Sequence, residues 1–388
     1  MQNFIRSLFH KKNLNHHHLS LRIIKKITKI TVQTIILLTI LSPLSAQTFS
    51  ESFLPFKGTP RHYICYRAAD SIVIDGKPDE ASWNMVAWSE DFKDIEGDAR
   101  PAPSLRTRLK MLWDDNYLYI AATMQEPHVW GTLQQHDAII FHDNDFEVFI
   151  DPDGDTHQYF EIEINALNTV MDLFMQKPYR NGGTAMLNWD VKGLRTAVSV
   201  NGTINQASDK DSSWTVEMAI PFSALRFFND PQHPADSAIW RINFSRVEWD
   251  TDIRNGRYVK QQRPEHNWVW SPQDIINMHA PERWGYLWFT TQTAGNGNVI
   301  FNVPATEDAK RYLWDIYHRQ QQYKRAHGRF ASTPKELGVT PEISAGNNKV
   351  YHLNIEGTSS QYEAIINGST FKGSIHLNQE GRIYSERK

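Results

Sequence analysis

Short runs of alternating apolar and polar residues fill most of the chain from Ile72 to Phe289. Every second residue of a run is apolar, which is the period of a strand with one buried face. Gly, Pro, Asp and Asn separate the runs, and no long helical stripe interrupts them. The pattern predicts a mainly β fold, an antiparallel immunoglobulin-like or jelly-roll β-sandwich. The clearest runs are Leu109-Met111-Trp113, Phe146-Val148-Ile150, Phe160-Ile162-Ile164, Val216-Met218-Ile220 and Trp240-Ile242-Phe244.

The composition changes near Gly295, which begins the sequence Gly-Asn-Gly-Asn. A helical pattern follows over 307–327, with Thr306 as candidate N-cap and Gly328 at its C-terminal end. Strand-like alternation then returns from Tyr351 onward. We therefore expect a β-sandwich over 72–290, a linker over 291–306 and a small α+β unit over 307–388. The sequence indicates no function for this C-terminal unit.

The first 46 residues have the features of an export signal. They hold seven basic and no acidic residues, and an apolar run from Ile30 to Leu44 ends in Ser45-Ala46. This pattern is typical of a cleaved signal peptide, although an uncleaved membrane anchor is the alternative. Residues 47–71 then form a lead-in to the sandwich. We expect the protein to be exported, to the periplasm, the outer surface or the medium.

The charge balance excludes some classes of partner. The chain has 41 basic and 44 acidic residues, and removal of residues 1–46 leaves 34 basic against 44 acidic, a formal charge of −10. Nucleic acid and anionic membranes are therefore not expected to be partners. Cys65 is the single cysteine, so no intrachain disulfide forms and packing, with or without a metal, must hold the fold. Export without disulfides suits a bacterial envelope protein.

A set of short motifs occurs in a fixed order along the predicted sandwich. The set is Ile74–Trp83 (IDGKPDEASW), Leu112–Ile120 (LWDDNYLYI), Asn144–Asp151 (NDFEVFID), Trp214–Pro221 (WTVEMAIP), Trp270–Pro272 (WSP) and Arg283–Leu287 (RWGYL). Together these motifs resemble the family 9 carbohydrate-binding modules over about 72–289. The resemblance implies a β-sandwich that binds sugars, often as an accessory to glycan-degrading enzymes, with structural calcium in several members.

The same resemblance implies a binding pocket in which two tryptophans stack on a sugar ring and polar side chains hold its hydroxyls. Glu147 matches the family's hydroxyl-binding glutamate. Phe141 stands where the first stacking tryptophan lies in the family. The second tryptophan falls within 275–279, where Met278 and His279 are found instead. The fold is thus better supported by the sequence than the choice of sugar.

Strand periodicity also predicts a polar face on the side opposite the core. If Phe146 points inward, then Glu147 and Phe149 point outward. Carboxylates and amides beside an aromatic ring suit sugar hydroxyls, whereas an ordinary solvated face is the alternative. The candidate ligand-binding residues are Glu147, Phe141, Phe149, Glu161, Glu163, Asn165, Arg241, Asn243, Trp270, Met278 and His279.

The chain has 13 tryptophans, which we divide by their sequence context. Those within strand patterns or at strand ends, Trp83, Trp113, Trp214 and Trp284, are predicted to be structural. Those in loop-like contexts, Trp130, Trp189, Trp268 and Trp270, are candidates for stacking on a ligand.

Two acidic clusters are candidate calcium sites. Asp151, Asp153 and Asp155 place three carboxylates within five residues. Asp75, Asp79 and Glu80 are the second set, on the grounds of the family resemblance. A hydrogen-bonded turn is the alternative in both places. Calcium, in a structural role, is the one cofactor that we expect.

We expect a non-catalytic carbohydrate-binding protein whose partners are a poly- or oligosaccharide and a glycan-degrading enzyme or surface complex. One alternative is a glycoside hydrolase with a carboxylate pair from Glu147, Glu161, Glu163 and Glu217. Another is a haem-binding electron-transfer sandwich like the DOMON domains, with axial ligands from Met278 or His279 and from Met171 or Met186. A third is a surface-assembly module that binds its partner through the C-terminal unit.

Overall fold

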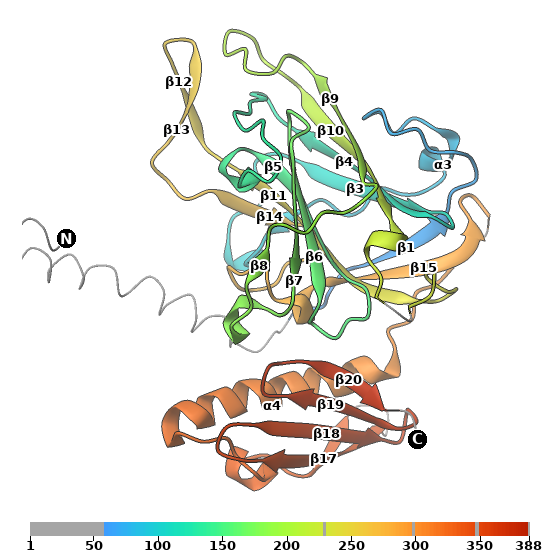
Figure 1. Ribbon diagram of the computed structural model, residues 1–388, viewed down its shortest axis with the longest axis vertical. Coiled ribbons are helices and arrows are strands. Elements are labelled where there is room, and N and C mark those ends of the chain that lie inside the picture. The colour runs from blue at the N-terminus through green and yellow to red at the C-terminus, as the bar shows by residue number, and fades with distance from the viewer. Residues whose placement is uncertain (1–57, 228–229, 297–298, 346–348, 387–388) are drawn as a thin grey trace, which may run out of the picture. The chain divides into compact units, whose positions relative to one another are not determined.

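The computed structural model describes residues 58–388 apart from 228–229, 297–298, 346–348 and 387–388. The predicted signal peptide and the start of the expected lead-in lie outside the described residues. The described chain contains a β-rich domain followed by a smaller unit built from one long helix and five strands (Figure 1). No described helix combines the length and the apolar character that a membrane crossing requires.

One sheet of 13 strands forms the β-rich domain in the described part of the chain, and it folds over into two layers. The strand order in the first layer is β8-β7-β6-β5-β11, and in the second β3-β4-β10-β9. The first-layer strands are β5 (Asp145–Asp151), β6 (Tyr159–Asn165), β7 (Val170–Met175), β8 (Ala185–Met186), β11 (Ile239–Glu248), β14 (His266–Val269) and β2 (Lys93–Asp94). Those of the second layer are β3 (Thr107–Trp113), β4 (Tyr117–Gln125), β9 (Arg195–Asn201) and β10 (Ser213–Pro221).

Two further strands, β1 (His62–Arg67) and β15 (Gly285–Thr293), join the two layers. β1 lies parallel to both of its neighbours, with His62 opposite Tyr286 of β15 and Tyr66 opposite Leu112 of β3. The expected lead-in at 47–71 therefore contains a strand of the sandwich. The pairings among the other strands of this sheet are antiparallel, as the sequence pattern predicts.

The core between the layers contains the apolar residues of the predicted runs. Phe146, Val148 and Ile150 of β5 are buried there with their counterparts from β3, β6, β10 and β11, and Trp240 packs against the edge. The prediction that Trp83, Trp113, Trp214 and Trp284 are structural is confirmed, since all four rings are fully buried. The domain therefore has the predicted mainly β, antiparallel sandwich fold.

The outer faces of both layers are also covered, which the sequence pattern does not predict. Every residue of β5 and β6 is buried. On the second layer the segment carrying α3 (Ala81–Asn84) packs Trp83 against Leu112 and Tyr119. A hairpin of β12 (Thr251–Arg254) and β13 (Arg257–Lys260) forms a separate two-stranded sheet.

Short 3₁₀ turns connect the strands of the domain. They are η1 (Gly97–Ala99), η2 (Ile140–His142), η3 (Tyr179–Asn181), η4 (Phe222–Ala224) and η5 (Pro281–Arg283). Of these, η2 and η3 carry residues of the candidate site described below.

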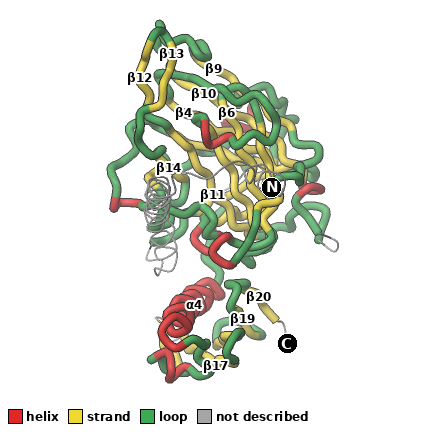
Figure 2. The backbone as a smooth tube through the Cα atoms, turned by 60° about the vertical axis from the view of Figure 1, so that its left-hand side comes forward, coloured by secondary structure: helices red, strands yellow, loops and turns green. Residues whose placement is uncertain are grey.

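The C-terminal unit packs helix α4 (Ala305–His327) on a five-stranded antiparallel sheet, as predicted (Figure 2). The N-cap position of the helix is Pro304 rather than Thr306 and makes no side-chain cap hydrogen bond, and Gly328 ends the helix in the left-handed conformation with φ of 73°. A turn η6 (Pro334–Leu337) precedes the sheet. The strands are β16 (Glu342–Ala345), β17 (Lys349–Gly357), β18 (Tyr362–Gly368), β19 (Ser374–Asn378) and β20 (Ile383–Glu386).

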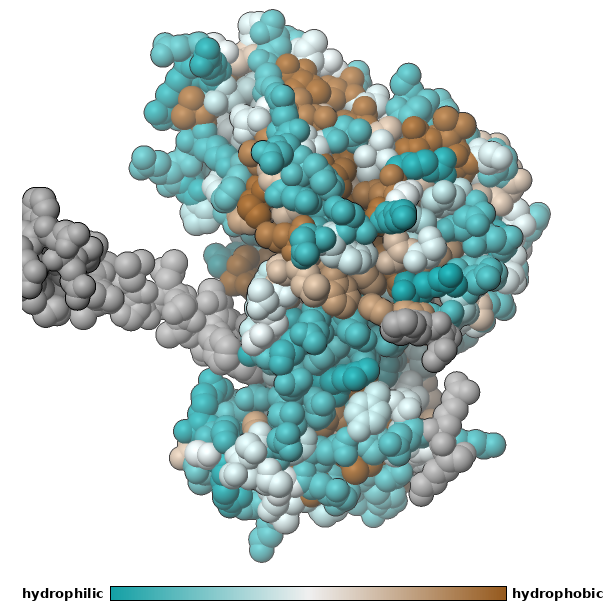
Figure 3. All heavy atoms as spheres, in the orientation of Figure 1, coloured by the Kyte–Doolittle hydropathy of each residue, from teal (hydrophilic) through white to brown (hydrophobic). Residues whose placement is uncertain are grey.

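The two parts of the chain differ in the polarity of their surfaces. In Figure 3 hydrophilic side chains dominate the visible face of the C-terminal unit, whereas hydrophobic side chains gather in several places on the sandwich. The exposed apolar residues of the sandwich include Val73, Met85, Tyr179, Leu187 and Ile253. Tyr179 and Leu187 also border a cavity.

Candidate functional site

A cavity of about 390 Å³ lies against the outer face of β5, β6 and β7. Its floor consists of side chains from these strands, and its walls come from the loops that cover them. The lining residues are Ile95, Ile139, Phe141, Glu147, Phe149, Glu161, Glu163, Met171, Leu173, Tyr179, Ala185, Leu187, Val247, Glu265, Asn267, Ile276, Asn277, Met278 and His279. We call this space the glutamate cavity.

Strand register places the three glutamates of the floor together. Glu147 on β5 is paired with Glu163 on β6, and Phe149 is paired with Glu161. Because alternate residues of a strand share a face, the four side chains project to the same side, away from the core. This prediction from the sequence is confirmed. The face is not solvated, however, since each of these glutamates is at most 5% exposed.

Burial raises the pKa values of the three glutamates in the floor. It raises the pKa of Glu161 to about 8, with a further contribution from the nearby charge of Glu147. The pKa values of Glu147 and Glu163 are also raised, first by burial and then by neighbouring glutamates. The raised pKa values favour the protonated form of these three carboxyls, and a protonated carboxyl both donates and accepts hydrogen bonds.

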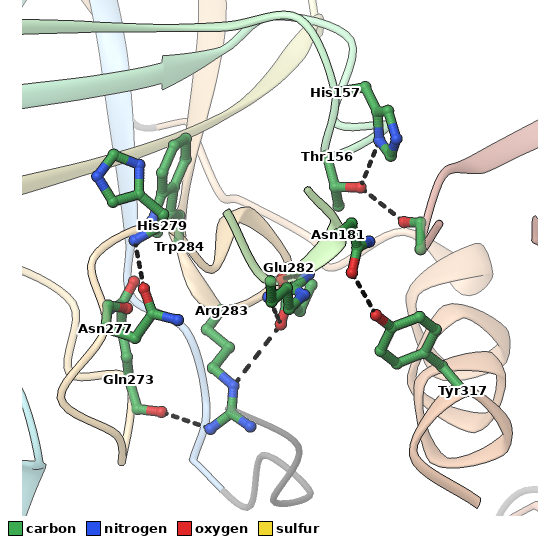
Figure 4. Close-up of polar contacts among 12 residues, drawn as sticks. Thr156, His157, Asn181, Gln273, Asn277, His279, Glu282, Arg283, Trp284 and Tyr317 are labelled. Atoms are coloured by element: carbon green, nitrogen blue, oxygen red, sulfur yellow. Dashed lines mark hydrogen bonds and ion pairs between the residues drawn. The ribbon is translucent and has the colours of Figure 1, made fainter. Parts of the chain in front are cut away.

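His279 forms one wall and is a neutral group. Burial lowers its pKa to about 4. Its Nδ1 is 2.9 Å from the hydroxyl of Tyr159, and its Nε2 is 3.7 Å from a carboxyl oxygen of Glu161. The backbone N–H of His279 donates to Asn277 Oδ1 over 3.0 Å, and this contact shapes the loop (Figure 4). A neutral imidazole beside an amide adds two further polar groups to the cavity.

Aromatic rings from three different elements reach the cavity. Phe149 rises from the floor and packs against Trp284, with ring centroids 5.7 Å apart. Tyr179 of η3 lies edge-on to His279, at a centroid distance of 4.5 Å. Phe141 of η2 is half-buried, and its backbone N–H donates to Glu163 over 3.0 Å. That contact connects the position of the Phe141 ring to a carboxyl of the floor.

Four predicted ligand-binding residues lie outside the glutamate cavity. Asn165 is fully buried and donates to the Leu133 carbonyl and to Asp143, and Asn243 is buried and donates to the Ser271 carbonyl. Both side chains point away from the core, as their strand parity predicts, but they are bound to loop residues and do not reach the cavity. Arg241 donates to the Trp284 carbonyl and lies over the ring of Tyr286.

The stacking role predicted for the loop tryptophans is wrong for Trp268 and Trp270, because both rings are buried in the sandwich core. Trp130 is also buried, and Trp189 packs against the core. Trp268 belongs to strand β14 and Trp270 directly follows it, so these two rings pack into the core and do not lie in a loop.

Several lining residues were not predicted. Tyr179, Glu265 and Ile276 come from turns or loops and have no strand parity that would assign them to this face, and Asn267 comes from the short strand β14. Proximity in the sequence to Met278 and His279 was the one available signal, and it applies only to Ile276 and Asn277.

The first predicted calcium cluster does assemble, since Asp151, Asp153 and Asp155 bring carboxyl oxygens within 4.8 Å of one another. However, the backbone N–H groups of Gly154 and Thr156 donate to Asp151. Asp153 and Asp155 likewise accept from backbone N–H groups. These residues fit a hydrogen-bonded turn, and calcium here stays a prediction.

The second predicted calcium set does not assemble. Asp75, Asp79 and Glu80 form no cluster of ligand atoms in the described chain. Instead, Asp75 Oδ1 accepts from the N–H of Lys77, and Glu80 accepts from the N–H of Val73. The segment is fixed by Glu217, which accepts from the backbone N–H of Gly76 and from Trp83 Nε1. Glu217 is thus a structural carboxylate outside the glutamate cavity.

The site is a carboxyl- and aromatic-lined cavity on one outer face of a two-layer antiparallel sandwich, a lining that suits a small polar ligand. Comparison with known proteins gives the family. Residues 74–287 match the carbohydrate family 9 binding domain-like family, and the chain belongs to it. This membership supports a carbohydrate-binding role.

Individual relatives are distant. Exoglucanase XynX of Acetivibrio thermocellus is 26% identical over 159 residues, which are 40% of this chain and 12% of that enzyme. A "putative carbohydrate-binding protein" of Bacteroides uniformis aligns over 60% of this chain and 100% of its own, with TM-score 0.46 and 16% identity. A family 9 module of Caldicellulosiruptor kristjanssonii in complex with cellotriose aligns over 62% and 100%, with TM-score 0.37 and 18% identity.

Proposed function

We propose that this chain is an exported, non-catalytic protein that binds a neutral saccharide in the glutamate cavity. The observation that carries the proposal is the grouping of Glu147, Glu161 and Glu163 with aromatic rings in one space of about 390 Å³. That volume is within the range of roughly 300–1,000 Å³ found for small-ligand sites. It suits a small saccharide or the end of a longer one.

The cavity offers no cation to an acidic sugar. Four glutamates line it, including Glu265, and the lining contains no lysine or arginine. His279 is neutral because its pKa is lowered to about 4. The charge of a uronic acid or sulfated sugar would lose water there without gaining a cation, whereas the hydroxyls of a neutral sugar meet both donors and acceptors.

The two kinds of lining residue have separate roles in this proposal. Phe141 and Tyr179 supply ring faces or edges for the C–H groups of a pyranose. Glu147, Asn267 and Asn277 supply hydrogen bonds that fix the orientation of its hydroxyls. Phe141 takes the place of a larger indole, so the stacking contribution is smaller than in a pocket with two tryptophans.

Export and an accessory role in glycan degradation complete the proposal. The basic and apolar first 46 residues support export. The similarity to a segment that makes up 12% of an exoglucanase supports a role beside glycan-degrading enzymes. Structural calcium at Asp151, Asp153 and Asp155 is the remaining part, and loss of thermal stability in a chelator would support it.

Isothermal titration of the full chain with glucose, cellotriose and an oligogalacturonide tests the proposal. We expect binding of a neutral sugar, no binding of the acidic one, and at least about tenfold weaker binding by Glu147→Ala, since a buried hydrogen-bonding group is lost. Glu356→Ala, which changes an exposed glutamate of β17, is the matched control. Equal affinity of Glu147→Ala and the wild type for every sugar bound would contradict the assignment of the cavity.

A glycoside hydrolase is the second candidate, and one observation favours it. The raised pKa of Glu161, about 8, is a property of a general acid, and Glu147 and Glu163 are nearby carboxyls. Incubation of the same three sugars with the protein and analysis for shorter products distinguishes the two. Turnover of cellotriose that Glu161→Gln abolishes would favour the enzyme over the binding protein.

A further inference from the structure

A second group of ionisable side chains lies outside the glutamate cavity, on the opposite face of β7, the face that Val170 and Phe174 share. It consists of His136, Asp137, Asp172 and Asp190, each of which offers a ligand atom within 4.8 Å of the others. His136 and Asp137 belong to the loop before η2, Asp172 to β7, and Asp190 to the segment between β8 and β9. Three segments that are separate in the sequence therefore meet here.

The orientation of His136 is fixed by the backbone. Its Nδ1 lies 2.9 Å from the carbonyl oxygen of Val170, and because a carbonyl only accepts, Nδ1 carries the proton. The N–H of Asp137 donates to the same carbonyl over 3.1 Å. A hydrogen bond from one ring nitrogen is the usual way in which proteins orient a metal-binding histidine, and here it leaves Nε2 as the ring atom that faces the rest of the group.

Nε2 faces three carboxylates and, when it is protonated, donates a hydrogen bond to Asp190. It lies 3.1 Å from Asp190, 3.5 Å from Asp137 and 3.7 Å from Asp172. A lone pair directed at several anionic oxygens is favourable only when a cation is shared among them. A proton on Nε2 points along one direction, so it serves one carboxylate well and leaves the others without a partner.

Asp172 provides an independent indication of a ligand. Its side chain is only 3% exposed, and Oδ2 accepts from the backbone N–H of Val191. Oδ1 points into the group and has no hydrogen-bond partner among the described residues, as is also true of Asp137 Oδ1. A buried carboxyl oxygen without a partner is costly, and a coordinated metal ion removes that cost.

We propose that His136, Asp137, Asp172 and Asp190 bind a divalent transition metal, with zinc as the reference ion. One imidazole nitrogen and three carboxylate oxygens make a four-ligand set that suits tetrahedral Zn²⁺. Calcium is disfavoured, because it takes oxygen ligands and more of them. His136 is 56% exposed and also lines an open hollow of about 500 Å³, so an ion can reach the site from solvent.

The position of this site gives the metal a structural consequence. The loop that carries His136 and Asp137 continues into Ile139 and Phe141, and the segment that carries Asp190 follows Ala185 and Leu187. All four of these neighbours line the glutamate cavity. The metal would tie both walls to β7, although the ion itself binds whether or not the cavity holds a sugar.

Metal titration of the full chain tests the inference. We expect one more equivalent of Zn²⁺ bound by the wild type than by His136→Gln or Asp172→Asn, and a visible absorption band with Co²⁺ that both variants lose. His233→Gln is the matched control, because His233 has Nδ1 3.0 Å from the Pro234 carbonyl and Nε2 near a single carboxylate, Asp115. Binding by the run His16–His18 is common to all these proteins and cancels in the comparison.

The outcomes separate clearly. Loss of one equivalent in both variants, or at least about tenfold weaker binding with unchanged circular dichroism, supports the site. Equal Zn²⁺ binding by the wild type and His136→Gln overturns it, and so does a site that Ca²⁺ fills as tightly as Zn²⁺. If Asp172→Asn does not fold, His136→Gln alone decides, since its side chain is more than half exposed.

Discussion

Glu147 and Glu163 are direct cross-strand partners on β5 and β6, so two buried carboxyls stand side by side beneath the cavity. Like charges at such a position destabilise a sheet unless one is neutralised. This pair therefore reduces the stability of the fold, and it lies where hydrogen bonds to a ligand would form. The predictions below separate residues of the cavity from residues of the fold.

The ring of Phe141 is predicted to contribute to sugar affinity. Phe141→Ala should weaken binding about tenfold, because an aromatic contact is worth about 1.5 kcal/mol at most. Phe141→Trp should strengthen it, since a larger ring covers more of a pyranose. Titration of each variant with the same saccharide measures the effect. Phe227→Ala, at an exposed phenylalanine outside the cavity, should leave the affinity unchanged.

Glu161 is predicted to make the stability of the protein fall as the pH rises. Burial raises the folded-state pKa of Glu161 to about 8 from its ordinary value of 4.5, so the folded state holds the proton more tightly than the unfolded chain. The stabilisation is complete below the unfolded pKa and is lost as the pH rises through about 8. Urea unfolding of the wild type should show lower stability at about pH 9 than at about pH 5. In Glu161→Gln this difference should be smaller, and an unchanged pH dependence would contradict the prediction.

Trp270 is predicted to matter for stability and not for binding. Trp270→Ala should lower the free energy of unfolding by about 3–5 kcal/mol, the usual cost of a cavity left by an aromatic ring. Urea unfolding measures the loss. Trp88→Ala, at a half-buried ring that lies beneath the guanidinium of Arg108, should cost much less. A variant of Trp270 that kept full stability but lost sugar binding would show that the ring acts at the ligand.

The buried ion pair of Arg180 and Glu282 is predicted to be sensitive to loss of one partner. Its two hydrogen bonds are 2.9 and 2.8 Å long, and both side chains are at most 3% exposed. Burial alone would raise the pKa of Glu282, but the charges of Arg180 and Arg283 lower it. Glu282→Gln should destabilise the protein by about 3–5 kcal/mol in urea unfolding, because it leaves a buried charge without its partner.

An exposed ion pair gives the control for that experiment. Lys93 and Asp98 are 2.7 Å apart, but their side chains are largely in solvent. Asp98→Asn should therefore leave the midpoint of unfolding unchanged. If Glu282→Gln behaved in the same way, the buried pair would be shown to contribute little.

Strand periodicity predicted the fold and the floor of the cavity because both follow from a period of two. The parity of Phe146 and Phe160 alone places Glu147, Glu161 and Glu163 on one face. Strand periodicity does not predict which loops cover that face. Tyr179 and Glu265 reach the cavity from loops, whose paths depend on tertiary contacts.

Two other differences have particular physical causes. Trp270 directly follows β14 and stands two residues before Pro272, and its ring fills space that exists because Gly285 has no side chain, since a Cβ there would lie 2.3 Å from the ring. The sequence pattern does not predict β1 as a strand of the sandwich, because its partners lie far along the chain. A parallel strand with distant neighbours leaves no turn signal beside it.

The parallel position of β1 between β15 and β3 has a consequence for the order of folding. His62 must meet Tyr286, 224 positions later, before the sheet is complete. Contacts between such distant residues form late, since the entropy of closing a long loop must first be overcome. Until then β15 and β3 present unpaired backbone edges, which are sites of aggregation. The newly made protein is therefore most vulnerable just before its amino-terminal strand arrives.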